Sequence, residues 1–331
     1  FLFNEGKNIF IIFFAAQSVL NGELTLGSML AIQYILGQLN SPVEQFVQFL
    51  QKYQDAELSI ERLNEVHQLE DEEPLAQPRL TRLPQEHTIA VQNLSFTYPG
   101  AGNEPVLKDI NLTIPEGKVT AFVGMSGSGK TTLLKLLLKS YTPNQGSIHL
   151  GAMNLKNLSH RFWRSTCGTV MQDGYIFSDT ISRNIAVADE TPDMEKLIEA
   201  SKIANILGFV ESLPLGFYTK IGSEGQGISQ GQKQRILIAR AVYKDPEFLF
   251  FDEATNSLDA HNEKVIMENL QSFYRGRTVV VVAHRLSTVK NADKIVVLDK
   301  GQIIEEGTHQ ELTQQRGAYY HLVKNQLELG G

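Results

Sequence analysis

Cysteine and tryptophan are scarce in this chain of 331 residues, which has one of each. Its formal net charge is small, at −7. The single cysteine, Cys167, excludes a disulfide-stapled secreted module and a four-thiolate zinc site within one chain. The small excess of acid over base argues against a broad nucleic-acid-binding surface. Most of this excess lies in residues 51–73, where two basic and eight acidic side chains give a local charge of −6.

The first fifty residues contain two apolar segments without charge. Residues 8–20 and 24–39 carry no charged side chain, and only the short turn NGE separates them, so the pattern predicts a helical hairpin. Each segment is shorter than the roughly 20 residues of a membrane-spanning helix, but extension to residues 1–49 gives adequate length. Two alternatives therefore stay open at this point: a hairpin in a membrane and a hairpin buried in a large helical core.

The next segment changes character twice. Past Pro42, apolar residues recur at spacings of three and four as far as Leu63 while the acidic residues occupy the other positions, which predicts a continuing helix. Residues 70–88 then contain three prolines and no periodicity, which is typical of a linker. A second domain is expected to begin near Thr88.

This second domain has an α/β pattern. Short runs rich in Val, Ile and Phe alternate with segments of helical period, and such runs are typical of buried strands in a parallel sheet. The predicted strands are residues Val119–Val123, Phe248–Phe251, Thr278–Ala283 and Lys294–Leu298.

Residues 124–131, GMSGSGKT, match the phosphate-loop motif G-x-x-x-x-G-K-[ST] between the strand VTAFV and the helical run TTLLKLLLK. The glycines let successive backbone N–H groups point at phosphates, and the helix N-terminus adds positive potential. Lys130 would reach the β- and γ-phosphates, and Thr131 would supply a Mg²⁺ ligand. The predicted nucleotide-binding residues of this loop are Gly124, Ser126, Gly127, Ser128, Gly129, Lys130, Thr131 and Thr132.

The run FLFF ends in the carboxylate pair Asp252 and Glu253. A carboxylate at the end of a buried strand beside the phosphate loop can hold Mg²⁺, which predicts this role for Asp252. Glu253 is predicted to orient and polarise the attacking water. Together with the phosphate loop, the pair indicates a nucleotide hydrolase.

A further anion-binding element is predicted at residues 228–232, ISQGQ, which open the helical run KQRILIARAVY. A chain with its own phosphate loop needs a second one only if it caps a nucleotide held by another subunit. This segment resembles LSGGQ, the signature motif of the ATP-binding-cassette (ABC) superfamily. Together with the other motifs, it makes the chain similar to that superfamily over residues 88–325. The chain departs from it at Ile228 and Gln230 and keeps Ser229, Gly231 and Gln232.

The resemblance implies roles for three more side chains. His284, after the strand TVVVVA, corresponds to a γ-phosphate contact; Gln172 corresponds to the glutamine that reaches Mg²⁺ and water; Tyr98 corresponds to the aromatic ring that stacks on adenine. Residues 256–259 correspond to a loop that crosses the dimer interface. Residues 222–224 correspond to a coupling segment characteristic of exporters.

The first part of the chain is also similar to exporters of this superfamily. NGELTLGSMLAIQYILGQLNSPVEQFVQF looks like the last membrane hairpin of an exporter half-transporter. More narrowly, GKNIFIIFF through ERLNEV and the terminal YYHLVKNQLELG are similar to peptidase-containing exporters of bacteriocin-like peptides. Cys167 lies inside the cassette, so no protease activity is expected of this chain.

The sequence is thus interpreted as an α/β P-loop ATPase domain preceded by an all-α transmembrane hairpin. The resemblance implies a parallel-sheet core, an antiparallel β subdomain and an α-helical signature subdomain. The expected division is residues 1–69 as the C-terminal part of a transmembrane domain, 70–87 as linker and 88–331 as nucleotide-binding domain. The implied cofactors are ATP and Mg²⁺, and the implied partners are a second copy in a head-to-tail homodimer, the lipid bilayer and an exported peptide, with no nucleic acid. The expected location is the inner (plasma) membrane, multi-pass, with the ATPase domain in the cytoplasm.

Three other functions compete with this interpretation. A lipid or drug exporter would have nearly the same cassette. A soluble ABC protein acting on DNA or ribosomes would need a coiled-coil insertion or a second cassette, and residues 132–227 offer no such insertion. A phosphate-loop kinase would have no use for the segment ISQGQ or for the hydrophobic hairpin.

Overall fold

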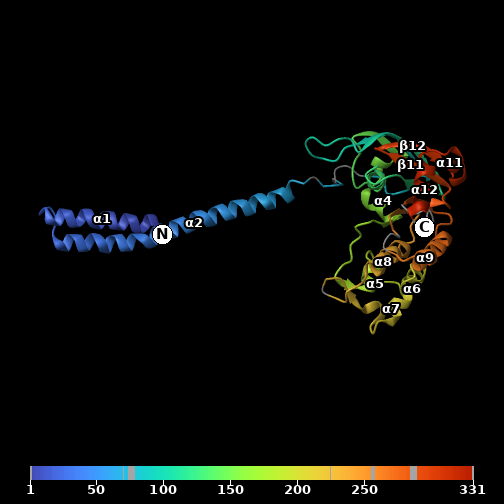
Figure 1. Cartoon of the computed structure of the whole chain (residues 1–331). Helices are drawn as coiled ribbons and strands as arrows, with labels where there is room; N and C mark the ends of the chain where they lie inside the picture. Colours follow the sequence, from blue (N-terminus) through green and yellow to red (C-terminus); the bar gives the residue numbers. More distant parts are fainter. Residues whose placement is uncertain are drawn as a thin grey trace. The chain divides into compact units, whose positions relative to one another are not determined.

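The computed structural model describes residues 2–69, 71–73, 79–223, 225–254, 258–283 and 289–329. The chain divides into two compact units, Phe1–Glu72 and Glu73–Gly331, which are coloured by sequence in Figure 1. The second is called the α/β unit below. The predicted three-part division of the chain stays a prediction.

The first unit consists of α1 (Leu2–Leu20) and α2 (Leu26–His67), which pack against each other as a hairpin. Thr25 begins α2 by accepting a hydrogen bond from the Ser28 backbone N–H at 3.1 Å. The helix runs through Pro42 without a break, as the apolar stripe predicted. Within the described residues, neither of these helices nor any other combines the length and the apolar character of a membrane span. The membrane character of the hairpin therefore stays a prediction.

The core of the α/β unit is a six-stranded sheet in the order β12-β11-β3-β10-β9-β6. Strands β11, β3, β10, β9 and β6 are parallel, which confirms the predicted parallel core, while β12 pairs antiparallel with β11 at one edge. The strands are β3 (Val119–Val123), β6 (Cys167–Val170), β9 (Phe248–Asp252), β10 (Thr278–Val282), β11 (Lys294–Asp299) and β12 (Gln302–Gly307). The sequence did not predict β6 or β12.

Alternation along β9 shows how both faces of this sheet are covered. Phe248 and Phe250 pack in one hydrophobic cluster with α3 (Lys130–Leu137), whereas Leu249 and Phe251 pack in another with α8 (Gln230–Tyr243). Every residue of β9 and β10 is buried. Burial on both faces explains why these strands read as continuous apolar runs.

A second sheet, in the order β2-β1-β4-β5, is antiparallel, as the resemblance implied. Its strands are β1 (Ile89–Phe96), β2 (Leu107–Ile114), β4 (Gln145–Leu150) and β5 (Met153–Asn154). Leu94 and Ile110 of this sheet share a buried cluster with Phe122 and Leu133, so α3 lies in a core that both sheets help to build.

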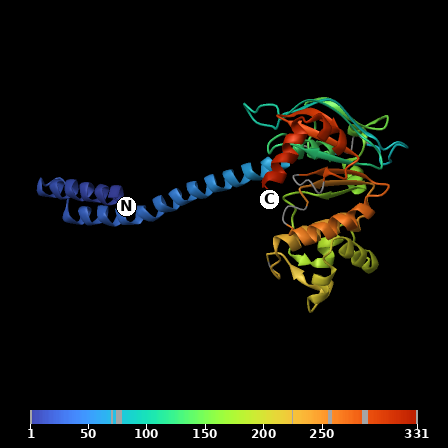
Figure 2. The ribbon, with the colours of Figure 1, turned by 45° about the vertical axis from the view of Figure 1, so that its right-hand side comes forward.

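The remaining elements are mostly helical. In Figures 1 and 2, α5, α6 and α7 form a lobe of the α/β unit apart from the two sheets, and α8 joins this lobe to the six-stranded sheet, because it packs on β6 as well as on α5 and α6. This arrangement agrees with the implied helical subdomain. The elements of the α/β unit whose bounds have not been given above are η1 (Leu155–Asn157), α4 (His160–Thr166), β7 (Asp179–Thr180), α5 (Ile181–Ile185), α6 (Met194–Ile203), α7 (Leu207–Ser212), η2 (Gly216–Tyr218), β8 (Lys220–Ile221), α9 (Ala260–Phe273), α11 (His309–Gln315) and α12 (Ala318–Leu329).

Trp163, on α4, joins three parts of this core. Its indole Nε1 donates to the Leu137 carbonyl at the end of α3, at 2.9 Å. Its ring lies against Phe248 of β9, with centroids 4.8 Å apart, and against Phe250, at 6.4 Å. The side chain is fully buried, so α4 is fixed to both the helix that follows the phosphate loop and the strand that ends in Asp252.

Part of the predicted linker is packed against the α/β unit. The Leu80 N–H donates to the Asn157 carbonyl at 2.9 Å, and the Ser159 N–H donates to the Leu80 carbonyl at 2.8 Å. These bonds form an isolated bridge to Leu158. The proline-rich composition correctly indicated the lack of a helix in the described residues 71–73 and 79–88, but it gave no sign of this contact.

Replacing Trp163 with Ala is expected to destabilise the α/β unit by about 3–5 kcal/mol, because it leaves a cavity where α3, α4 and β9 meet. Chemical unfolding followed by far-UV circular dichroism measures the change. Tyr218→Ala is the control, since Tyr218 is 65 % exposed and its loss should change the free energy of unfolding by under about 0.5 kcal/mol. Equal losses in the two variants would contradict the central role of Trp163.

Candidate functional site

The strand register brings four loops to one edge of the six-stranded sheet. Val282 of β10 pairs with Phe122 of β3 on one side and with Asp252 of β9 on the other. Val170 of β6 pairs with Phe251. Because all four strands are parallel, the loops that follow them open at the same edge, where ligands of open α/β sheets bind.

Two glycines of the phosphate loop are required by the way the loop is packed. Gly124 has φ +147°, and a Cβ there would lie 2.1 Å from the Leu298 carbonyl oxygen. Gly129 has φ +102°, and a Cβ there would lie 2.6 Å from a methyl carbon of Leu107. Side chains at these positions would push the loop away from β11 and β2. The predicted structural role of the glycines therefore agrees with the geometry.

Lys130 begins α3 and is only 5 % exposed. Its Nζ donates to the carbonyl oxygens of Gly124 at 3.0 Å and Met125 at 2.8 Å, and to Ser128 Oγ at 3.3 Å. Burial lowers the pKa of Lys130, and the nearby Glu253 and Asp252 oppose that effect. The ammonium group thus lies within its own loop and close to the carboxylates that end β9.

Asp252 lies beside the first turn of α3. Its Oδ1 accepts a hydrogen bond from Thr131 Oγ1 at 3.1 Å, and its side chain is fully buried. Burial raises its pKa, with Glu253 adding to the effect, whereas the Thr131 hydroxyl and the charges of Lys135 and Lys130 lower it. Its Oδ2 has no hydrogen-bond partner among the described residues. A buried carboxylate oxygen without a donor, next to a hydroxyl, fits the hard oxygen ligands that Mg²⁺ prefers.

Glu253 follows at the turn that leaves β9. It has φ +52°, a left-handed conformation that is uncommon outside glycine and is typical of functional turns. Its backbone N–H donates to the Val282 carbonyl at 3.1 Å. Unlike the fully buried Asp252, Glu253 is only half-buried, so its carboxylate has access to water.

Tyr98 lies against the same helix end from the antiparallel sheet. Its hydroxyl is 3.1 Å from Thr132 Oγ1. Its ring meets Phe96 and Tyr141 edge-on, with centroids 5.0 and 5.2 Å away. The structure thus brings Tyr98 to the first turn of α3. The structure also places Tyr141, which is 37 % exposed, beside Tyr98. The sequence analysis missed Tyr141 because the sequence marks it only by its place shortly after the helix.

Gln172 lies in an exposed turn directly after β6. The turn is closed by a hydrogen bond of 3.1 Å from the Gly174 N–H to the Met171 carbonyl. Since Val170 pairs with Phe251, the turn begins level with the end of β9. The register therefore places the Gln172 turn next to the loop that carries Asp252 and Glu253.

The predicted second anion-binding element caps α8. Ser229 Oγ accepts from the Gln232 N–H at 3.2 Å, and Gln232 Oε1 accepts from the Ser229 N–H at 2.8 Å, which makes a capping box. Ser229 and Gln230 are exposed, and Gly231 is half-buried. The Ser229 hydroxyl accepts in the cap, so its own hydrogen can still be donated outward.

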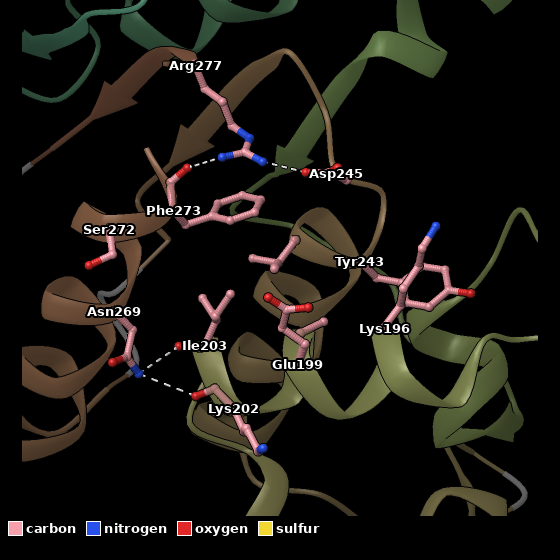
Figure 3. Close-up of a pocket in the computed structure, with 12 residues that line it drawn as sticks. Lys196, Glu199, Lys202, Ile203, Tyr243, Asp245, Asn269, Ser272, Phe273 and Arg277 are labelled. Atoms are coloured by element: carbon pink, nitrogen blue, oxygen red, sulfur yellow. Dashed lines mark hydrogen bonds and ion pairs between the residues drawn. The ribbon is translucent and has the colours of Figure 1, made fainter. Parts of the chain in front are cut away.

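A cavity of about 570 Å³ lies elsewhere, between α6, the end of α8 and α9. Figure 3 shows two of its polar side chains bonded to other lining residues: Arg277 bonds to Asp245, and Asn269 donates to the Lys202 and Ile203 carbonyls at 3.3 and 3.2 Å. Its lining comprises Lys196, Glu199, Ala200, Lys202, Ile203, Val242, Tyr243, Asp245, Asn269, Ser272, Phe273 and Arg277. No predicted site residue is in this set, so the cavity is separate from the candidate site.

Several predicted positions fall outside the described residues. These are His284, residues 256–257 of the expected interface loop and Glu224 of the expected coupling segment. Their proposed roles stay predictions. The described neighbours Gly222 and Ser223 pack on the segment that follows the Gln172 turn, since Ser223 Oγ lies 2.7 Å from Ser178 Oγ.

Comparison with known proteins finds a matching family model and similar export proteins. Residues 107–256 match the sequence profile of the family described as ABC transporter. The chain is 39 % identical over 322 residues to the leukotoxin export ATP-binding protein LtxB of Aggregatibacter actinomycetemcomitans. It is 40 % identical over 321 residues to the alpha-hemolysin translocation ATP-binding protein HlyB of Proteus vulgaris. Each match covers 97 % of this chain and 45 % of the relative, so the chain spans about half the length of these relatives.

Residues 107–256 are thus similar to the ABC transporter family. The relatives are ATP-binding export proteins, and the enzyme class of such domains is ATPase. A solved structure of a bacterial Atm1-family ABC exporter with ATP bound superposes with a TM-score of 0.76 at 30 % identity. The superposition covers 92 % of this chain and 53 % of that one, in agreement with the P-loop fold.

Gly124→Ala is expected to weaken ATP binding by at least about tenfold, because the new Cβ would meet the Leu298 carbonyl and force the loop to shift. Gly127→Ala is the matched control. It has φ +78° but no atom within 4 Å of the position that a Cβ would take, so only backbone strain opposes the change. Titration with a fluorescent ATP analogue compares the two. Weaker binding by Gly127→Ala than by Gly124→Ala would contradict the packing argument.

Proposed function

We propose that this chain is an ATP-hydrolysing subunit of an exporter, in which ATP binding and hydrolysis drive export of a substrate. The observation that carries the proposal is the hydrogen bond of 3.1 Å between Thr131 and Asp252. It joins the phosphate loop to the strand-end carboxylate within an ABC ATP-binding domain. A domain that only bound nucleotide would have no need for the adjacent Glu253.

Each site residue has a distinct task in this proposal. The loop N–H groups and Lys130 bind the phosphates, and Tyr98 stacks on adenine. Thr131, Asp252 and Gln172 hold Mg²⁺, which when bound offsets the negative charge of the phosphates. Glu253 accepts a proton from the attacking water, and His284 contacts the γ-phosphate. The metal assignment is supported by the buried Oδ2 of Asp252, which has no hydrogen-bond partner in the part of the chain that the structure describes.

A second copy of the chain is proposed to complete each site. Ser229 lies exposed at the start of α8, with a hydroxyl hydrogen that can be donated to a phosphate oxygen. The same domain already has a complete phosphate loop, so the capped end of α8 serves the nucleotide of a partner. This arrangement is a head-to-tail homodimer with two ATP molecules, in which Ser229, Gly231 and Gln232 of one copy face Lys130 of the other.

The hairpin of α1 and α2 is proposed to belong to the membrane domain, with residues 70–87 as linker and 88–331 as ATPase domain. Large apolar side chains on both helices support this, since Phe10, Phe13 and Ile35 are at least 55 % exposed. The match to export proteins also covers 97 % of the chain and hence includes this hairpin. The proposed location is the inner (plasma) membrane, with the ATPase domain in the cytoplasm.

The proposed substrate is a peptide or protein. The relatives are named for export of a leukotoxin and of alpha-hemolysin, which favours a polypeptide over a lipid or drug. Membership of the peptidase-containing group of bacteriocin exporters is the finer form of this proposal. Stimulation of ATP hydrolysis by a leader peptide, but not by lipid or drug, would test it.

Glu253→Gln is expected to slow hydrolysis by a factor on the order of 10² or more, because the amide keeps the size of the side chain and removes its basicity. ATP binding should be nearly unchanged. The variant should therefore accumulate as a dimer with ATP bound, which gel filtration with ATP and Mg²⁺ detects. Glu268→Gln, at an exposed position of α9, is the control for the loss of one negative charge. Normal turnover by Glu253→Gln would remove Glu253 from the mechanism.

Ser229→Arg is expected to block turnover while each chain still binds ATP, because the cation would occupy the partner's phosphate site. ATP affinity measured at dilution and phosphate release measured at high concentration separate the two effects. Lys220→Ala, at an exposed position on β8, is a control in the same lobe. A loss of binding at dilution as large as the loss of turnover would place Ser229 in its own chain's site.

A further inference from the structure

The start of α4 is bound by residues from well upstream in the chain. One carboxylate oxygen of Glu73 accepts from Ser159 Oγ at 3.2 Å, and the other accepts from the His160 backbone N–H. Leu80 exchanges backbone hydrogen bonds with Asn157 and Ser159. We call these contacts of Glu73 and Leu80 with residues 157–160 the linker clip.

The carboxylate of Glu73 is well matched to this position. Burial works to raise its pKa, but the hydrogen bonds from His160 and Ser159 and the nearby charges of His160 and Arg79 lower it overall. The Arg79 guanidinium also donates to the Lys156 carbonyl at 3.4 Å. The linker clip therefore has two parts: the charged Glu73 carboxylate binds the start of α4, and the Leu80 backbone pairs with residues just before it.

The helix held by the clip leads directly to the ATP site. Trp163, one turn into α4, packs on Phe248 of β9, the strand that ends in Asp252. After Thr166 the chain continues at once into β6, and β6 ends one residue before Met171 and the Gln172 turn. The start of α4 is thus connected to the loops after β6 and β9 through the buried Trp163 of this helix and through two paired strands.

The clip also lies only a short stretch of chain beyond α2. This helix ends at His67, and Glu73 follows six residues later. The first strand of the α/β unit, β1, begins much further along the chain, at Ile89. Any pull exerted by α2 along the chain would therefore reach Glu73 before it reached β1.

We propose that Glu73 is a positioning residue: it fastens the linker to α4 and thereby sets the position of the Gln172 turn for ATP hydrolysis. This proposal rests on the proposed ATPase function. It gives the linker a mechanical role, because movement of α2 would be transmitted to the Gln172 turn through α4 and β6.

The test uses the full chain in detergent and three variants. Glu73→Ala removes both acceptors, whereas Glu73→Gln keeps one carbonyl oxygen for either donor. Asp71→Asn is the matched control, because Asp71 is exposed and loses the same charge two residues away. Hydrogen exchange of the His160 and Gly174 amides, kcat and KM for ATP, and thermal melting are measured for each.

For Glu73→Ala, we expect faster exchange of the His160 amide by about tenfold and faster exchange at Gly174, the amide that closes the Gln172 turn. The kcat should fall about fivefold with little change in KM, because phosphate and adenine contacts are untouched. Glu73→Gln should recover much of both effects, and Asp71→Asn should match the unaltered chain. A merely structural fastening would leave Gly174 exchange and kcat unchanged.

A fourth variant tests the pathway. Leu80→Pro removes the N–H that donates to Asn157, at the other end of the clip. If both ends act through α4, the effects of Glu73→Ala and Leu80→Pro on kcat should be strongly non-additive. Additive effects, or unchanged Gly174 exchange in both variants, would overturn the proposal. If the unaltered chain had no ATPase activity, the proposed function would be refuted. Hydrogen exchange of the Gly174 amide would still show whether the linker clip controls the Gln172 turn.

Discussion

The parallel register of β3, β10, β9 and β6 is the constraint on which the rest of the site depends. It brings the phosphate loop, the carboxylate pair and the Gln172 turn to one edge, although these segments are separated by more than forty residues in sequence. A one-residue slip of β9 would move Asp252 away from Thr131 and exchange the residues that face α3 and α8. The alternation of Phe248 and Phe250 with Leu249 and Phe251 between two buried clusters opposes such a slip.

The sequence predicted those parts whose signals are local. The phosphate loop, its flanking strand and helix, and the four apolar strands were visible because buried parallel strands are apolar at every position. The turn between α1 and α2 and the cap of α8 were similarly marked by short segments. Edge strands carry weaker signals: β12 alternates half-buried and exposed residues, and β6 is only four residues long.

Contacts between distant residues could not be predicted in this way. Glu73 and His160 are 87 positions apart, and nothing in either segment marks them as partners. Tyr141 and Tyr98 meet only because α3 and β1 share one hydrophobic core. The sequence analysis assigned Glu73 to a linker without periodicity, yet its carboxylate is bound at the start of a helix. Such pairings follow from tertiary packing, which composition and periodicity do not encode.

The Lys130 ammonium is held by three oxygen acceptors of its own loop. Binding of a phosphate to this group is therefore an exchange of acceptors, and only the difference in strength between the two sets appears as affinity. Neutral carbonyl and hydroxyl oxygens are weaker acceptors than phosphate oxygens, which carry formal charge. A ligand with a single weak acceptor would gain little from displacing them, whereas a polyphosphate chain gains at several positions together. With Lys130 in its proposed phosphate-binding role, the loop would therefore select ligands by charge density, independently of any contact with the base.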